Sequence, residues 1–292
     1  MKNIGLINKQ KGKYGKYNAL KAIQYAFLAF LLCSALILGG NNVNAAELQN
    51  PQEGQTTTQA SAETQDNTGK IIAKSGNKYY EYPDGKKVKS KFITIGKKTY
   101  YFGSTGAMEK GWMKKGKDYY YFDRNSGVQK KNCTVDGIKI TKDGKAKKTN
   151  YSKKKIQTMI KAKGIVSKQT KVTDSKSKKL EKVFKWVMKH PYNRHRIFAK
   201  VRNSKGWEMT YANDIFKKNG NGCCVSESCA LAFLAKECGY SKVYVCDDTA
   251  HSWVEINGRV YDTLFAEAKS YKNYYNSTYK VSKLHCVNKL KI

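Results

Sequence analysis

Acidic residues are scarce in this chain. It holds 22 Asp and Glu against 56 Lys and Arg, a formal net charge of +34 at pH 7 over 292 residues. This balance favours polyanionic neighbours: nucleic acid, anionic lipid or an anionic wall polymer such as teichoic acid. The lysines are spread over every segment, which indicates a solvated surface more than a face that binds nucleic acid. The length leaves room for one or two domains.

Metal-binding cysteine patterns are also missing. None of the 8 cysteines forms a Cys-x-x-Cys pair, so a zinc site has little support, and we expect neither a metal nor a cofactor. Cys33 lies in an N-terminal apolar run. The seven cysteines beyond it leave at least one thiol free even if disulfides form after export.

The apolar run is too short to span a membrane. Residues 23–38 make up about 16 residues, whereas a spanning helix needs roughly 20. Lysines without any acid precede the run, and Val43-Asn44-Ala45-Ala46 follows it as a small-residue cleavage site. These features predict a signal peptide over residues 1–45 and an exported chain without a stable membrane span, for which nucleic acid is not an expected partner. An uncleaved N-terminal anchor is the alternative.

Lys and Arg are absent between residues 47 and 68, where Gln, Thr, Ser, Asn and acids dominate. This composition cannot bury a core. We therefore expect residues 46–69 to be a disordered linker.

Residues 70–147 repeat. A glycine followed by an aromatic or apolar run recurs at Gly76, Gly96, Gly116 and, in degraded form, Gly137, with steps of 20, 20 and 21 residues. Each copy is predicted to be an aromatic strand, a glycine turn and a short return strand, with turns at Asp84-Gly85, Thr105-Gly106, Ser126-Gly127 and Asp143-Gly144. Because one hairpin cannot bury its aromatic face alone, we expect an all-β hairpin-repeat solenoid.

The clearest copy reads Gly106-Ala107-Met108-Glu109-Lys110-Gly111-Trp112, then Gly116 and Tyr119-Tyr120-Tyr121-Phe122. It resembles the cell-wall-binding repeats of Gram-positive surface proteins, the choline- and glucan-binding type. The resemblance implies a secreted, cell-wall-associated protein whose repeats bind a wall polymer (teichoic acid, choline or glycan) through aromatic rings. The candidate ligand aromatics are Trp112, Tyr100, Tyr101, Tyr119 and Tyr120. The alternative is that the tyrosines are solenoid core.

Residues 148–292 are predicted to be a second domain that begins with helices. Residues 151–165 and 175–190 have helical patterns, and Pro191 ends the second. The lysine-rich residues 145–154 are expected to be a hinge.

Gly220-Asn221-Gly222 then delivers Cys223 and Cys224 to the start of an apolar helix, which we expect to be buried. The positive end of a helix lowers the pKa of a thiol there, and its free N–H groups can hold an oxyanion. Cys224 is therefore a candidate nucleophile. Cys229 and Cys238 are expected to be small core residues.

Asn257-Gly258 is a strong signal for a two-residue hairpin turn. Such a turn pairs Trp253 with Asp262, and His251 shares a face with Trp253. His251 and Asp262 are then diagonal neighbours within side-chain reach. Taken singly, each residue has a purely structural alternative: His251 could be an ordinary partly buried histidine, and Asp262 a solvated strand end. Together with Cys224 they predict a catalytic Cys-His-Asp triad.

Cys224, Gly239 fifteen residues on, His251-Ser252-Trp253 and Asp262 also resemble the core pattern of the transglutaminase-like superfamily. The resemblance spans roughly residues 150–290. It implies a papain-like α+β fold for this part of the chain.

The same resemblance selects Cys224 over Cys223, because only Cys224 stands fifteen residues before the glycine. Cys223 departs from the family's pattern, and a vicinal or Cys223–Cys229 disulfide could regulate the site. The family's aromatic helper of the oxyanion hole corresponds to Trp207 or Tyr211, between which the sequence does not decide.

These observations predict an exported, wall-associated thiol enzyme that acts on protein or peptide amide bonds through a thioester. Peptidase or amidase activity is favoured over cross-linking, partly because no acidic calcium loop is present. The alternative is a catalytically inactive wall-binding or adhesion protein.

Overall fold

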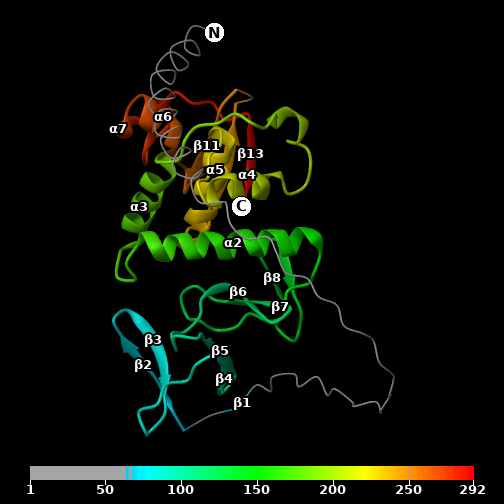
Figure 1. Ribbon diagram of the computed structural model, residues 1–292, viewed down its shortest axis with the longest axis vertical. Helices are drawn as coiled ribbons and strands as arrows, with labels where there is room; N and C mark the ends of the chain where they lie inside the picture. The colour runs from blue at the N-terminus through cyan, green and yellow to red at the C-terminus, as the bar shows by residue number, and fades with distance from the viewer. Residues whose placement is uncertain (1–63, 66–67, 249) are drawn as a thin grey trace, which may run out of the picture. The chain divides into compact units, whose positions relative to one another are not determined.

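A computed structural model describes residues 64–65, 68–248 and 250–292 (Figure 1). The expected signal peptide (1–45) and most of the expected linker (46–69) lie outside the described residues. Within the linker range, Thr64–Gln65 forms strand β1, which pairs in parallel with Ile93 and Thr94.

Four antiparallel hairpins follow, which confirms the predicted repeats. They are β2 (Lys70–Lys74) with β3 (Asn77–Glu81), β4 (Lys91–Ile95) with β5 (Lys98–Phe102), β6 (Gly111–Lys115) with β7 (Asp118–Phe122), and β8 (Cys133–Val135) with β9 (Ile138–Ile140).

The predicted pairing inside each repeat is confirmed only in part. Each aromatic strand forms its ladder with the strand before it. The segment after the glycine turn returns to the aromatic strand through a single antiparallel bridge in each repeat. The first hairpin turns at Ser75 (φ 51°) and Gly76 (φ 78°), a pair of positive φ values that matches the twist of two adjacent strands. After the turn at Asp84-Gly85, Glu81 bridges to Lys87 and Val88 N–H donates to Tyr80 C=O at 3.0 Å.

The hairpins stack in chain order through backbone hydrogen bonds. The segment after each hairpin donates to the aromatic strand of the hairpin before. Met108 N–H donates to Lys78 C=O at 2.8 Å, Gln129 to Thr99 at 2.8 Å, and Ala146 to Tyr119 at 2.9 Å. The repeats therefore bury their aromatic faces against their neighbours, as expected of a solenoid.

The rest of the chain is an α+β region. Its elements are α2 (Asn150–Gln169), α3 (Lys176–Met188), the short η1 (Phe198–Lys200), α4 (Trp207–Phe216), α5 (Cys224–Glu237), β10 (Val243–Asp247), β11 (Ser252–Ile256), β12 (Arg259–Tyr261), α6 (Thr263–Ala268), α7 (Tyr271–Tyr274), α8 (Tyr279–Ser282) and β13 (Asn288–Lys291). The strands form one antiparallel sheet in the order β12-β11-β10-β13. Helix α5 packs on β10 and β11 and is surrounded by α2, α3 and α4. None of the helices in the described residues combines the length and apolar character that a membrane crossing requires.

Three glycines fix the ends of α5, which is buried on all sides as predicted. A Cβ at Gly220 would lie 2.1 Å from the Ile215 carbonyl oxygen, and one at Gly222 would lie 2.3 Å from the Ser226 Cβ. Gly239 has a φ of +93°, and Tyr240 N–H behind it donates to Ala235 C=O. This is a left-handed helix cap, so the fifteen-residue spacing from Cys224 to Gly239 is the helix length plus its cap.

The expected hinge at residues 145–154 is wrong, because the hydrophobic core continues across it. Ala146 is buried, and Ile138 and Ile140 of the last hairpin share one core cluster with Ile156 of α2. Figure 1 shows α2 running between hairpin β6–β7 and helix α5, and residues of all four elements belong to that cluster.

Buried ion pairs reinforce this junction. Arg124 in the repeats bonds Glu237 at the end of α5 at 2.8 Å, and Lys236 bonds Asp136 at 3.0 Å. Local sequence patterns cannot show such pairs, since the partners are far apart along the chain.

Candidate active site

The β11–β12 hairpin has the register that its turn predicts. Val254 lies opposite Tyr261, and Ile256 lies opposite Arg259. Asn257 (φ 51°) and Gly258 (φ 78°) form the turn, which confirms the prediction. His251 therefore stands just before β11, and Asp262 just after β12.

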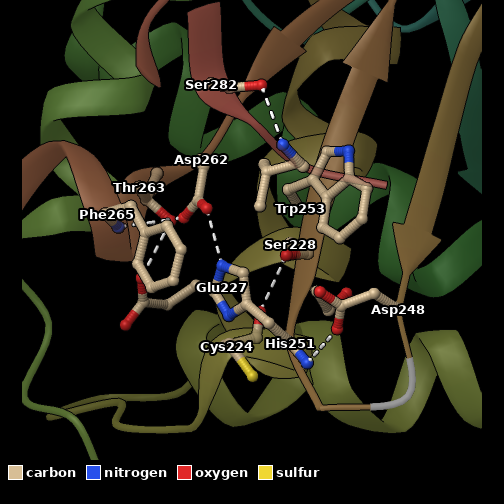
Figure 2. A network of polar contacts seen from close by, with 12 residues as sticks. Cys224, Glu227, Ser228, Asp248, His251, Trp253, Asp262, Thr263, Phe265 and Ser282 are labelled. Carbon is tan, nitrogen blue, oxygen red and sulfur yellow. Dashed lines mark hydrogen bonds and ion pairs between the residues drawn. The ribbon is translucent and has the colours of Figure 1, made fainter. Parts of the chain in front are cut away.

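The His251 imidazole and the Asp262 carboxylate meet, as Figure 2 shows. Their Nε2 and Oδ2 atoms are 2.6 Å apart, and the Asp262 side chain is 1% exposed. The other carboxylate oxygen caps α6 by accepting the Phe265 N–H at 3.0 Å. Because a carboxylate only accepts, Nε2 carries the proton and Nδ1 of the neutral ring is left as a base.

Further contacts hold the imidazole in place. The Phe265 ring stacks on it at 4.0 Å between centroids and 11° between planes. The Trp253 ring lies at 6.2 Å, and the His251 backbone N–H donates to Asp248 at 2.7 Å. Phe265 was not predicted. The only available signal was its place three residues after Asp262, in the first turn of the helix that Asp262 caps.

Cys224 is the first residue of α5, and Figure 2 shows it on the side of the imidazole away from Asp262. Among the described contacts its thiol makes no hydrogen bond to His251. It bonds the neighbouring thiol of Cys223 instead. The structure thus joins His251 to Asp262 directly and leaves Cys224 near the pair without a bond to it.

The neighbouring thiols of Cys223 and Cys224 shift each other's pKa in opposite directions. The hydrogen bond from Cys224, together with the N–H groups of Ser226 and Val225, lowers the pKa of Cys223 to about 6. The same bond to Cys223, with burial, raises the pKa of Cys224. The prediction that the helix lowers the pKa of Cys224 is therefore wrong.

No disulfide forms in the described residues, where all seven cysteines are free thiols. Cys229 and Cys238 are buried in the core, as expected. Neither the vicinal pair nor Cys223 with Cys229 is bonded in this structure.

Tyr192 and Glu227 complete the surroundings of the thiols, and sequence reasoning missed both. Burial and then the charges of Cys224 and Cys223 raise the pKa of Tyr192 to about 12. The backbone of Tyr192 forms an isolated β-bridge with Gly222. Pro191, the residue before Tyr192, is the sequence signal for this non-helical position. Buried Glu227 accepts the Thr263 hydroxyl at 2.8 Å.

Trp207 and Tyr211, the two aromatics considered as oxyanion helpers, both lie on α4, their rings 6.0 Å apart. Burial and then the charge of Cys224 instead raise the pKa of Tyr192, an aromatic residue outside α4.

Four of the five predicted wall-ligand aromatics are buried: Trp112, Tyr100, Tyr101 and Tyr119. Trp112 is 1% exposed, and its Nε1–H donates to Asp136 at 2.9 Å. Tyr100 and Tyr119 are buried as well. The rings of these three residues are covered by the neighbouring hairpins and α2. This burial favours the alternative that they are solenoid core, and ligand binding by them stays a prediction.

Buried Tyr101 and half-buried Tyr120 form an aromatic cage with Phe92, and Tyr101 and Phe92 are 8% and 5% exposed. The Phe92 ring lies 4.8 Å from Tyr101 and 5.2 Å from Tyr120. The Lys115 ammonium lies 4.9 Å from the Tyr101 ring and 5.2 Å from the Phe92 ring, and burial lowers its pKa. The cage therefore holds a cation of the chain itself, the geometry of a cation–π site.

Comparisons with known proteins concern the repeats. Residues 88–133 match the choline-binding repeat family. Choline binding protein F from Streptococcus pneumoniae is 26% identical over 27% of this chain and 26% of that chain, with a TM-score of 0.25. The choline binding domain of Spr1274 from the same species is 24% identical over 27% and 93%, also with a TM-score of 0.25. No curated protein matches the chain.

This chain thus covers about a quarter of choline binding protein F. The matched residues include the aromatic cage of Phe92, Tyr101 and Tyr120. Residues 88–133 are choline-binding repeats, a kind of repeat that implies association with the cell wall.

Proposed function

We propose that residues 148–292 are a papain-like, transglutaminase-like thiol enzyme that the repeats hold at a bacterial cell wall. One observation carries the proposal. The buried 2.6 Å bond from His251 Nε2 to Asp262 fixes the imidazole with Nδ1 as its free base, beside the helix that begins with Cys224 (Figure 2). An ordinary core histidine needs neither a buried carboxylate nor a neighbouring thiol at a helix start.

The chemistry is acyl transfer. Cys224 Sγ attacks an amide carbon while His251 Nδ1 takes the thiol proton and passes it to the leaving amine, so the C–N bond breaks and a thioester forms. Asp262 stabilises the imidazolium. N–H groups of the first turn of α5 face the developing oxyanion. Water then attacks the thioester, with His251 again as the base, and releases a carboxylic acid.

Hydrolysis is the favoured outcome, because water alone completes it and peptide amides are the acyl donors of a cell wall. An amine in place of water would give cross-linking by the same thioester. The two outcomes share every residue named above and differ only in the second substrate.

The test follows a glutamine-containing peptide, with and without an added primary amine, incubated with the reduced full chain. Newly exposed peptide ends indicate a peptidase, glutamate an amidase, and an amine adduct a transglutaminase. Cys224→Ala must abolish any product, and Cys133→Ser, remote from the site, serves as the matched control. No product from any peptide, with wall binding intact, would instead support the inactive adhesion protein.

For the repeats, we propose that the cage of Phe92, Tyr101 and Tyr120 binds the quaternary ammonium of choline on a wall polymer. The Lys115 ammonium already occupies cation–π distance from two of its rings. Choline therefore has to displace Lys115 before it can bind.

A further inference from the structure

A cavity of about 450 Å³ opens beside α4, away from the repeats' cage. Its lining includes Lys154, Arg196, Lys200, Lys205, Trp207 and Tyr211, and no acidic side chain lines it. A cavity with four cations and aromatic walls suits an anion attached to an organic group.

Most of this positive charge is not neutralised. Arg196 pairs with buried Asp214 at 2.6 Å. Among the described residues, none of the three lysines forms an ion pair: Lys154 donates to the Thr210 hydroxyl, and Lys205 lies over the Tyr151 ring. The cavity therefore keeps a positive excess that an incoming anion would neutralise.

Tyr211 gives a second, independent indication of a ligand. It is 1% exposed, and its hydroxyl has no hydrogen-bond partner among the described residues. The rings of Phe198 and Trp207 lie 5.8 and 6.0 Å from its ring, and the Arg196 guanidinium lies 5.9 Å away. A buried hydroxyl without a partner is rare, and a bound acceptor would satisfy it.

One loop connects the cavity with the turn before the thiols. The loop that provides Arg196 also runs beside the turn that precedes the thiols, where Asn193 N–H donates to Gly222 C=O at 2.8 Å. After burial, the charge of Cys223 is the next cause that raises the pKa of Tyr211. Tyr211 therefore lines the cavity on one side and is affected by the charge of Cys223 on the other.

We propose that this cavity binds an anionic group, a carboxylate or a phosphate, on the substrate whose amide reaches Cys224. The proposal rests on the proposed function and names a substrate class for it: amides that carry a negative charge a few bonds from the scissile bond. Tyr211 donates to the anion, and the cavity lysines supply its countercharge.

Binding is measured first, by calorimetry of inorganic phosphate and of acetate on the reduced Cys224→Ala chain. This variant separates the cavity from catalysis. We expect saturable binding that Tyr211→Phe weakens about tenfold, since a hydrogen bond to a charged group is lost. Lys200→Ala/Lys205→Ala should weaken it at least as much, whereas Lys97→Ala/Lys98→Ala, on an exposed hairpin tip, should leave it unchanged.

The same variants separate the two sources of the anion. A soluble glycerol-phosphate oligomer provides phosphate, and an amidated peptide with one free side-chain carboxylate provides the other group. Tighter binding of either one than of its neutral counterpart, lost in Tyr211→Phe, supports the proposal and names the source. Anion binding that is absent, or unchanged in both cavity variants, overturns it. If the chain binds anions but has no amide activity, the proposed function is wrong and anion binding by the cavity is still supported.

Discussion

Asp262 accepts a hydrogen bond from His251 at 2.6 Å and, through its other oxygen, caps helix α6. One buried carboxylate therefore fixes both the base of the candidate site and the helix whose Phe265 stacks on that base. The hairpin register, the helix cap and the imidazole tautomer depend on the same residue.

Asp262→Asn should reduce amide turnover about a thousandfold, because the amide favours the wrong tautomer and cannot stabilise the imidazolium. Substrate KM should change little. Asp248→Asn is the matched control, since it keeps an oxygen to accept the His251 backbone N–H and should retain most activity. Equal losses of activity in both variants would mean that turnover depends on the loop of Asp248 and not on the charge of Asp262.

Gly222→Ala should destabilise the fold by about 1–3 kcal/mol, because a Cβ there lies 2.3 Å from the Ser226 Cβ. Gly164→Ala should have the opposite effect on stability. Gly164 is inside α2, and a Cβ added to it would meet no side chain of the described residues within 4 Å, so alanine should stabilise the chain by up to about 1 kcal/mol. Urea unfolding measures both, and a neutral Gly222→Ala would contradict the close approach that positions the thiols.

The stability of the reduced chain should depend on pH through Cys223. Its folded pKa, about 6, lies below the ordinary value of 9.0. The stabilisation from its thiolate is therefore full above the unfolded pKa and is lost as pH falls through 6. Relative to Cys223→Ser, the wild-type chain should gain unfolding free energy from pH 6 to pH 9. A difference that stays constant over this range would show that Cys223 is not ionised by the helix end.

Above that range Cys224 acts with the opposite sign. Its folded pKa is raised, so the unfolded chain ionises first and the wild-type advantage should fall again above pH 9. The same unfolding series, extended to pH 10, checks this decline.

Lys115→Ala should strengthen choline binding by the repeats, because it empties the cage of Phe92, Tyr101 and Tyr120. Tyr101→Leu should weaken binding, since it removes a cation–π wall. Lys114→Ala, the neighbouring exposed lysine of β6, is the control and should bind like the wild type. Equilibrium dialysis with choline gives the affinities, and weaker binding by Lys115→Ala would mean that the ligand site lies elsewhere.

The sequence predicted those features that short-range geometry decides. Asn257-Gly258 determines one hairpin register, and that register alone brings His251 to Asp262. Gly222 and Gly239 mark the two ends of α5 because each occupies a backbone position that other residues enter with difficulty.

Features that depend on packing between distant segments could not be predicted. The bond between Cys223 and Cys224 depends on side-chain directions at one helix end, and the Lys115 ammonium enters its cage only when two hairpins stack. The predicted hinge failed for the same reason, since the contact of Arg124 with Glu237 has no local pattern.

The most direct test of the triad is the rate of alkylation by iodoacetamide at pH 7, with peptide mapping that separates Cys223 from Cys224 in the reduced, folded chain. Cys223 is buried and Cys224 is only partly so, so the account predicts modification at Cys224 in spite of the lower pKa of Cys223. The modification should slow at least tenfold in His251→Ala, where no base removes the thiol proton, and should stay unchanged in Asp248→Asn. Modification confined to Cys223, or a Cys224 rate that is the same without His251, would contradict it.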